Sequence, residues 1–257
     1  MKNLHLTLDT TLQGAAVALF EVDGAGFRRL ALASRPETFG SAAALPELVR
    51  RVLEEAGVTL ADLQHLYVSQ GPGSFTGIKV GLAFAAGLVA GRRSSADLSP
   101  CGVPALDSLA WWHCLQCHRP VVWLVPATRT HGFAALAIPD QPPNAWLIEL
   151  TEEITFRNEN GQAAVGLPDQ SQCLWVQALP WEGLTEWGGR TGISLLRPEE
   201  SGLMDESAGD GLAGLTMAAM IRRALSGEAG AVIRMPEPRY RRLSTPEEKL
   251  QNNRAKK

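Results

Sequence analysis

The sequence predicts an α/β protein in which helices cover a mixed β-sheet. Residues 4–11 alternate apolar and polar side chains and end in a small polar turn, as a strand that runs into a loop does. Residues 41–56 place apolar side chains at helical spacing. A glycine-rich turn then leads into a segment, 78–90, that is apolar on nearly every face. This order of elements is typical of helices packed on a sheet with parallel strand pairs.

The remaining elements of the first half follow from local signals. Residues 14–20 are apolar enough for a second strand, and the DGAG turn at 23–26 leads into a third strand at 28–34. Ser41 is a suitable N-cap for the first helix, and Gly57 ends it. The segment LQHLYVS, 63–69, forms the strand before the glycine-rich turn.

The second half has weaker signals. The composition changes over 94–103, which reads as a connection and places a boundary near residue 104. A helix is expected at 105–117 and another at about 211–225, whereas 152–172 reads as polar loop. Two strands are expected at 121–127 and 132–138, and an extended PEPRYRR closes the pattern. The predicted regions are an N-terminal lobe at 1–104, a smaller second lobe at 105–225 and a basic extension at 226–257.

Length and composition exclude several classes of protein. The chain has 257 residues, of which 45% are hydrophobic and 20% charged, as in an ordinary globular protein. The longest uncharged apolar run, 80–91, is far shorter than the roughly 20 residues that a membrane-spanning helix needs. The start meets an acidic residue, Asp9, before any continuous apolar stretch, so no secretory signal is expected. We therefore expect a cytoplasmic protein with no membrane contact.

The net charge of −3 is unevenly distributed. Residues 234–257 contain eight basic and three acidic side chains, so this tail carries +5 and the rest of the chain −8. A basic tail can contact phosphates of a nucleic acid, or it can be a solvated terminus. Both interpretations remain open.

Four cysteines, at 101, 114, 117 and 173, are too few and too irregular for a disulfide framework. The segment Cys114-Leu-Gln-Cys117-His118 has the literal spacing of a c-type haem attachment site, and His113 precedes it. Haem attachment requires export, and a zinc site requires a second ligand pair that the chain lacks. We expect neither haem nor zinc there.

Two short segments invite comparison with phosphate-handling proteins. Asp9-Thr10-Thr11 lies where a first strand meets a hairpin, the position of a metal-binding Asp and phosphate-binding hydroxyls in actin-like and sugar-kinase-like sheets. The same tripeptide also opens ordinary β-turns. Residues 188–192, GGRTG, are compatible with an adenosine loop or with a plain turn.

The most informative segment is Gly71-Pro72-Gly73-Ser74-Phe75-Thr76-Gly77. Its glycines and proline favour a sharp turn, and Ser74 or Thr76 can cap the following helix, whose free amides could bind an anion. It lacks the ending of a Walker loop and the spacing of a dinucleotide fingerprint. The helix carries small residues on two faces, which permits close helix approach. One face holds Gly77, Gly81 and Ala85, the other Ala83, Gly87, Ala90 and Gly91.

This turn, followed by Ile78-Lys79-Val80-Gly81, closely resembles the signature of the bacterial TsaB (YeaZ) family. Further segments resemble the same family: LDTT at 8–11, Leu45-Pro46, the GV-to-Leu109 segment at 102–109, and Pro238, Tyr240 and Arg242 in a PxYxR pattern. The resemblance implies an actin/sugar-kinase-like (ASKHA) fold of two lobes with mixed sheets flanked by helices, the second lobe reduced.

The resemblance also implies a function. TsaB proteins are non-catalytic subunits of the machinery that makes threonylcarbamoyladenosine in tRNA, and they dimerise with the catalytic homologue TsaD. A TsaE-like ATPase completes the complex, and tRNA is met indirectly. We therefore expect no catalytic, cofactor-binding or metal-binding residues, and a homodimer is expected where the partner is absent. An actin-fold kinase or ATPase is the alternative.

The resemblance places the partner interface on the two helices 41–56 and 75–91, and Gly81 and Ala85 are expected to face outward. The expected interface residues are Leu45, Val49, Val52, Leu53, Gly77, Val80, Gly81, Phe84, Ala85 and Leu88.

Overall fold

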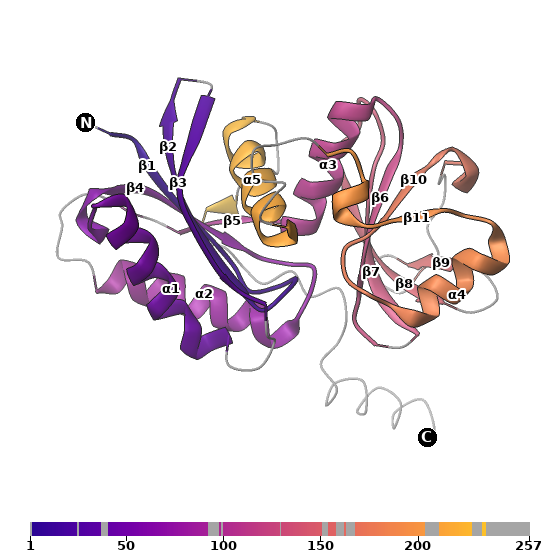
Figure 1. Ribbon diagram of the computed structural model, residues 1–257, viewed down its shortest axis with the longest axis horizontal. Coiled ribbons are helices and arrows are strands. Elements are labelled where there is room, and N and C mark those ends of the chain that lie inside the picture. Colours follow the sequence, from indigo (N-terminus) through magenta and orange to yellow (C-terminus); the bar gives the residue numbers. More distant parts are fainter. Residues whose placement is uncertain are drawn as a thin grey trace.

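The structure is a computed structural model of the whole chain. It describes residues 2–24, 26–36, 41–91, 98, 100–128, 130–150, 154–157, 162, 168–203, 211–227 and 233–234. Two six-stranded mixed sheets lie side by side with helices between and around them (Figure 1). The extended PEPRYRR segment and most of the basic tail fall outside the described residues.

The first sheet has the strand order β12-β5-β4-β1-β2-β3. Strands β1, β2 and β3, the first three along the chain, form the predicted antiparallel meander. Strand β4 runs parallel to β1, and β5 runs parallel to β4. Two parallel neighbouring strands need a crossover connection, usually a helix, because the chain has to return to the end of the sheet at which the first strand began. The strands are β1 (Leu4–Asp9), β2 (Ala15–Asp23), β3 (Gly26–Arg35), β4 (Leu63–Ser69), β5 (Pro100–Val103) and β12 (Ile233–Arg234).

Two helices, α1 (Ser41–Ala56) and α2 (Phe75–Ala90), cover one face of this sheet (Figure 1). The alternation in β1 explains why, since Leu4, Leu6 and Leu8 point to this face and are fully buried. They pack in one cluster with apolar side chains of α1 such as Leu45. Both predicted helices are confirmed.

The opposite face of the first sheet is covered by α5 (Gly211–Leu225), which packs on α3 (Ala105–Cys117). The helix α5 contacts β1, β2 and β4, whereas α3 contacts β6 and β7 of the second sheet. One apolar cluster therefore runs from Phe20 in the first sheet through Trp112 to Trp123 in the second. The predicted boundary at residue 104 stays a prediction.

The second sheet has the order β11-β10-β6-β7-β8-β9. Strands β6, β10 and β11 are parallel, and β7, β8 and β9 continue the sheet as antiparallel neighbours. Helix α4 (Glu182–Thr191) packs Leu184 and Trp187 into the core of this half. The strands are β6 (Val121–Pro126), β7 (His131–Ala137), β8 (Asn144–Leu150), β9 (Ile154–Arg157), β10 (Leu174–Gln177) and β11 (Leu195–Leu196).

Three expectations for irregular segments were wrong. The segment read as polar loop contains the edge strand β9 and a 3-10 turn at Gln170–Gln172, and the connection before residue 104 contains β5. Residues 188–191 are neither an adenosine loop nor a plain turn, because they form the end of α4, and Gly192 terminates that helix with a φ of 72°. Buried Leu184, Trp187 and Gly188, at helical spacing, hold this glycine-containing segment in a helix.

No helix within the described ranges combines the length and apolar content needed to cross a membrane.

Two buried histidines are held in their neutral form. Burial, followed by the charge of His65, lowers the pKa of His5 from 6.5 to about 4. Burial likewise lowers the pKa of His113 to about 4, and Trp123 Nε1 donates to His113 Nδ1 at 3.2 Å, a bond that requires this nitrogen to be unprotonated.

Stability should therefore fall in mild acid. Between pH 6.5 and about 4 the unfolded chain takes up protons at His5 and His113 that the folded chain resists, so the free energy of unfolding decreases as pH falls through this window. Urea unfolding at pH 7.5 and pH 5 measures the effect. We expect His5→Phe, which keeps a ring in the pocket, to lose less stability between the two pH values than the parent. Equal losses would contradict this account.

Candidate functional site

The signature turn Gly71–Gly77 joins β4 to α2 and lies against the turn that follows β1. The Ser74 amide donates to the Thr11 carbonyl oxygen at 2.8 Å, and the Thr10 hydroxyl donates to the Gly77 carbonyl oxygen at 2.7 Å. Two turns that lie about sixty residues apart in the sequence are thereby joined by hydrogen bonds in both directions. We call these contacts the turn lock.

The glycines of the signature are required by the closeness of this contact. A Cβ built at Gly73 would overlap the Thr11 carbonyl oxygen, and one at Gly77 would overlap the Thr10 carbonyl oxygen. Gly73 also has a φ of +155°, which side-chain-bearing residues rarely adopt. A Cβ at Gly81, one turn further along α2, would lie 2.5 Å from the Thr10 hydroxyl. Glycine thus occupies the positions at which the signature turn and α2 lie closest to the turn after β1.

The side chain of Asp9 is turned inward. Its Oδ1 accepts hydrogen bonds from the Thr11 amide at 2.9 Å and the Thr11 hydroxyl at 2.6 Å, and that hydroxyl lies 2.8 Å from the Ser69 hydroxyl. All three side chains are buried. Of the two interpretations of Asp9-Thr10-Thr11, these contacts favour the structural one, because the groups that would meet a metal or phosphate bond one another.

Ser74, and not Thr76, is the N-cap of α2. Its hydroxyl accepts the Gly77 amide at 3.1 Å, so one of the amides expected to bind an anion already has a partner within the chain. Thr76 is exposed on the outside of the first turn. The cap and the turn lock together hold the start of α2 in place.

The structure divides the expected interface residues into two groups. Val80, Phe84 and Leu88 are partly exposed, whereas the others are buried in the chain's own core. The expectation that Gly81 and Ala85 face outward was wrong, since Gly81 lies against Thr10 and Ala85 is fully buried under α2. The buried members are Leu45, Val49, Val52, Leu53, Gly77, Gly81 and Ala85.

The second small-residue face of α2 is the one that faces away from the sheet. Its exposed positions recur at helical spacing and carry a single charge, Lys79, whose ammonium lies 4.2 Å from the centre of the Phe75 ring. A Cβ at Gly87 would meet no atom within 4 Å, so this position is open. The exposed residues of this outward face are Thr76, Lys79, Ala83, Ala86, Gly87 and Ala90.

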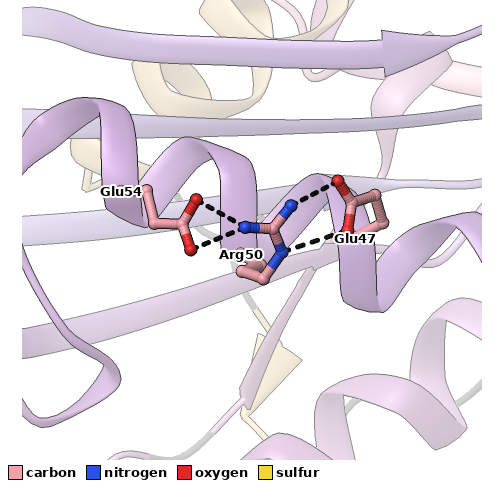
Figure 2. Close-up of polar contacts among 3 residues, drawn as sticks. All are labelled: Glu47, Arg50 and Glu54. Atoms are coloured by element: carbon pink, nitrogen blue, oxygen red, sulfur yellow. Dashed lines mark hydrogen bonds and ion pairs between the residues drawn. The ribbon is translucent and has the colours of Figure 1, made fainter.

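The exposed side of the neighbouring helix α1 is charged. Arg50 lies between Glu47 and Glu54 and makes 2.6 Å ion pairs with both, which Figure 2 shows along one side of the helix. The hydrogen bonds that Arg50 donates to Glu47 first, and then to Glu54, raise the pKa of the arginine above its ordinary value. Exposed pairs of this kind add little to stability. These exposed charges do make the outer surface of α1 strongly hydrated, unlike the outward face of α2, which carries mostly small apolar side chains.

The CLQCH segment forms the end of α3. Cys114 is buried, and burial, followed by the charges of Cys117 and Asp140, raises the pKa of its thiol to about 11. His118 is the C-cap in a left-handed conformation, with a φ of 52°. Within the described residues, no three His, Cys, Asp or Glu side chains are grouped so that they could hold a metal ion.

Comparison with known proteins agrees with this geometry. A model of the family described as "TsaD: tRNA N6-adenosine threonylcarbamoyltransferase" matches residues 40–137, which include α1, the signature turn and α2. The chain is 35% identical over 105 residues to the "tRNA threonylcarbamoyladenosine biosynthesis protein TsaB" of Escherichia coli K12. That alignment covers 41% of this chain and spans 42% of the E. coli protein.

Two solved structures from Pseudomonas aeruginosa have a similar fold. One, described as an uncharacterized protein with similarity to peptidase YeaZ, has a TM-score of 0.56 at 20% identity, and the match covers 93% of this chain and all of that one. The other, YeaZ, has a TM-score of 0.54 at 17% identity and covers 94% of this chain and all of its own.

The fold is shared with these two YeaZ-like structures and consists of two mixed sheets flanked by helices, with a glycine-rich turn locked onto the first strand. In sequence, part of the chain is similar to the TsaD family model and to E. coli TsaB, and the chain spans less than half of the length of that relative.

The turn lock predicts opposite effects for two glycines of α2. Gly77→Ala should lower the free energy of unfolding by several kcal/mol, because its methyl group overlaps the Thr10 backbone. Gly87→Ala should be neutral or raise stability by up to about 1 kcal/mol, because the site is open and alanine favours helix. Chemical denaturation of both variants measures the difference. A Gly77→Ala protein as stable as Gly87→Ala would refute the turn lock.

Proposed function

We propose that this protein is a non-catalytic subunit of the tRNA threonylcarbamoyladenosine machinery and that it dimerises with a TsaD-like catalytic homologue. The proposal is supported by the identity to E. coli TsaB, whose name gives that pathway, and by the residues that the TsaD family model matches. These residues include both helices on which the partner interface is expected.

The observation that carries the proposal is the outward face of α2. It exposes Ala83, Ala86, Gly87 and Ala90 to solvent with no acidic side chain among them. Small apolar side chains make no hydrogen bonds to water, so covering this face with a partner costs little desolvation energy. Their small size also allows the backbone of a second helix to come close. We therefore place the partner on α2, with the partly exposed Val80, Phe84 and Leu88 beside it.

The turn lock is the reason to propose a subunit in place of a phosphate-transferring enzyme. In an actin-like kinase the β1 turn and a nearby loop present an acid and free amides to the nucleotide. Here the Asp9 carboxylate accepts two hydrogen bonds from Thr11, and the Ser74 amide donates to the Thr11 carbonyl. In this proposal, the turn serves to position α2.

The proposed location and the further partners of the subunit are those expected for the threonylcarbamoyladenosine machinery. The subunit would be cytoplasmic, a TsaE-like ATPase would join the pair, and tRNA would be met through the complex. Without a partner, the outward face of α2 would pair with the same face of a second copy, because the same apolar surface needs cover.

Charge introduced on the outward face should abolish the complex. Gly87→Arg places a cation where Cβ meets no atom, so the fold has room for it, yet in the interface the charge would be desolvated and unpaired. A cost of several kcal/mol, at 1.4 kcal/mol per tenfold, removes micromolar binding. Co-purification and analytical ultracentrifugation with the TsaD-like protein of the same organism measure the loss.

The matched control is Gly189→Arg, since Gly189 is also exposed in a helix and open at Cβ but lies on α4. We expect it to bind like the parent, with both variants melting near the parent temperature. A folded Gly87→Arg protein that still forms the complex would move the interface away from α2.

The enzymatic alternative has its own test. We expect the isolated chain to hydrolyse ATP no faster than a buffer blank. Turnover that disappears in Asp9→Asn would establish the kinase or ATPase alternative in its place.

A further inference from the structure

A cleft of about 760 Å³ opens between the turn after β1 and the second sheet. It is formed by the turn after β1, the end of β10, the start of α4, the segment after β11 and the start of α5. None of its lining residues belongs to the proposed partner face. Its polar lining includes Gln13, Gln177, Glu182, Thr185, Arg197 and Glu199.

The position of the cleft favours a ligand. Gln177 ends β10 and Leu196 ends β11, and these strands are parallel neighbours in the second sheet. In α/β sheets, ligands bind outside the carboxyl ends of parallel strands, where the backbone ends and loops diverge. The volume is also within the range of pockets that bury a drug-sized molecule.

The lining determines which ligand fits. Its apolar part comes from Leu179, Leu195, Leu196 and Leu212. The polar rim carries charges of both signs, with the carboxylates of Glu182 and Glu199 and the guanidinium of Arg197 all solvent-exposed. An apolar molecule with one positive and one negative end matches such a rim.

A nucleoside triphosphate matches it poorly. Its phosphates would meet two carboxylates and one guanidinium, so the local charge is unfavourable to a polyanion. The Asp9 and Thr11 groups that would have to assist the phosphates are bonded to each other.

We propose that this cleft binds a short zwitterionic peptide with apolar side chains. Its carboxylate would pair with Arg197, its ammonium with Glu182 or Glu199, and its side chains would cover the leucines. A single free amino acid would leave much of a cleft of this size filled with water. The proposal is independent of the partner face of α2 and does not require the pathway proposed above.

The test uses the full chain and trileucine with free termini in isothermal titration calorimetry. We expect a dissociation constant below about 1 mM. Acetylation of the amino end and amidation of the carboxyl end should each weaken binding at least fivefold. In Arg197→Gln, amidation should no longer matter, and in Glu182→Gln/Glu199→Gln, acetylation should no longer matter, as coupled partners require.

Glu186→Gln is the matched control, because Glu186 is exposed on α4 but does not line the cleft. It should bind trileucine like the parent. The exchanged side chains are exposed, and thermal unfolding near the parent temperature verifies that each variant is folded. The proposal fails if trileucine does not bind up to about 10 mM, if binding ignores the two termini, or if ATP binds more tightly than trileucine.

Discussion

The structure depends most on the turn lock, the contact between the turn after β1 and the glycine-rich turn before α2. Hydrogen bonds from Ser74 to Thr11 and from Thr10 to Gly77 hold the two turns together, and glycine at 73 and 77 lets their backbones meet. Because both turns follow parallel neighbouring strands, β1 and β4, the lock also ties the helix to the sheet register. The position and rotation of α2 follow from these contacts.

The rotation of α2 decides which small residues reach solvent. With Gly81 against Thr10 and Ala85 under the helix, the opposite stripe of Ala83, Gly87 and Ala90 must face outward. The neighbouring α1 exposes paired charges in the same region. The hydrogen bonds of the turn lock inside the protein thus produce, outside it, a helix face of mostly small side chains whose single charge is Lys79. The proposed partner binding rests on that face.

Much of the fold could be predicted because its elements have strong periodic signals. The strict alternation in 4–11 indicates a strand, and the helical spacing of Leu45, Val49 and Val52 indicates an amphipathic helix. The alternation did not reveal that β1 is buried on both faces. The four-residue strand β9 and the two-residue strand β11 carry too few residues to show a period. Helix α4 was missed because its glycines suggested a turn, while the buried contacts of Leu184 and Trp187 that hold the helix are tertiary.

The site was only partly predictable for a related reason. The signature turn, its role as a helix start and Ser74 as a possible cap followed from residue types. The outward side of α2 did not, because both faces of this helix consist of small and apolar residues and its hydrophobic pattern has no clear direction. The inner face is distinguished from the outer one by tertiary contacts, the close approach of Gly77 and Gly81 to Thr10 and the burial of Ala85.

Hydrogen–deuterium exchange of the chain, alone and mixed with the TsaD-like protein, tests the central claim most directly. Our account predicts that the partner slows exchange in the amides of residues 76–90 and leaves α4, residues 182–191, unchanged. Slower exchange confined to the second sheet and α4, with α2 unaffected, would contradict it.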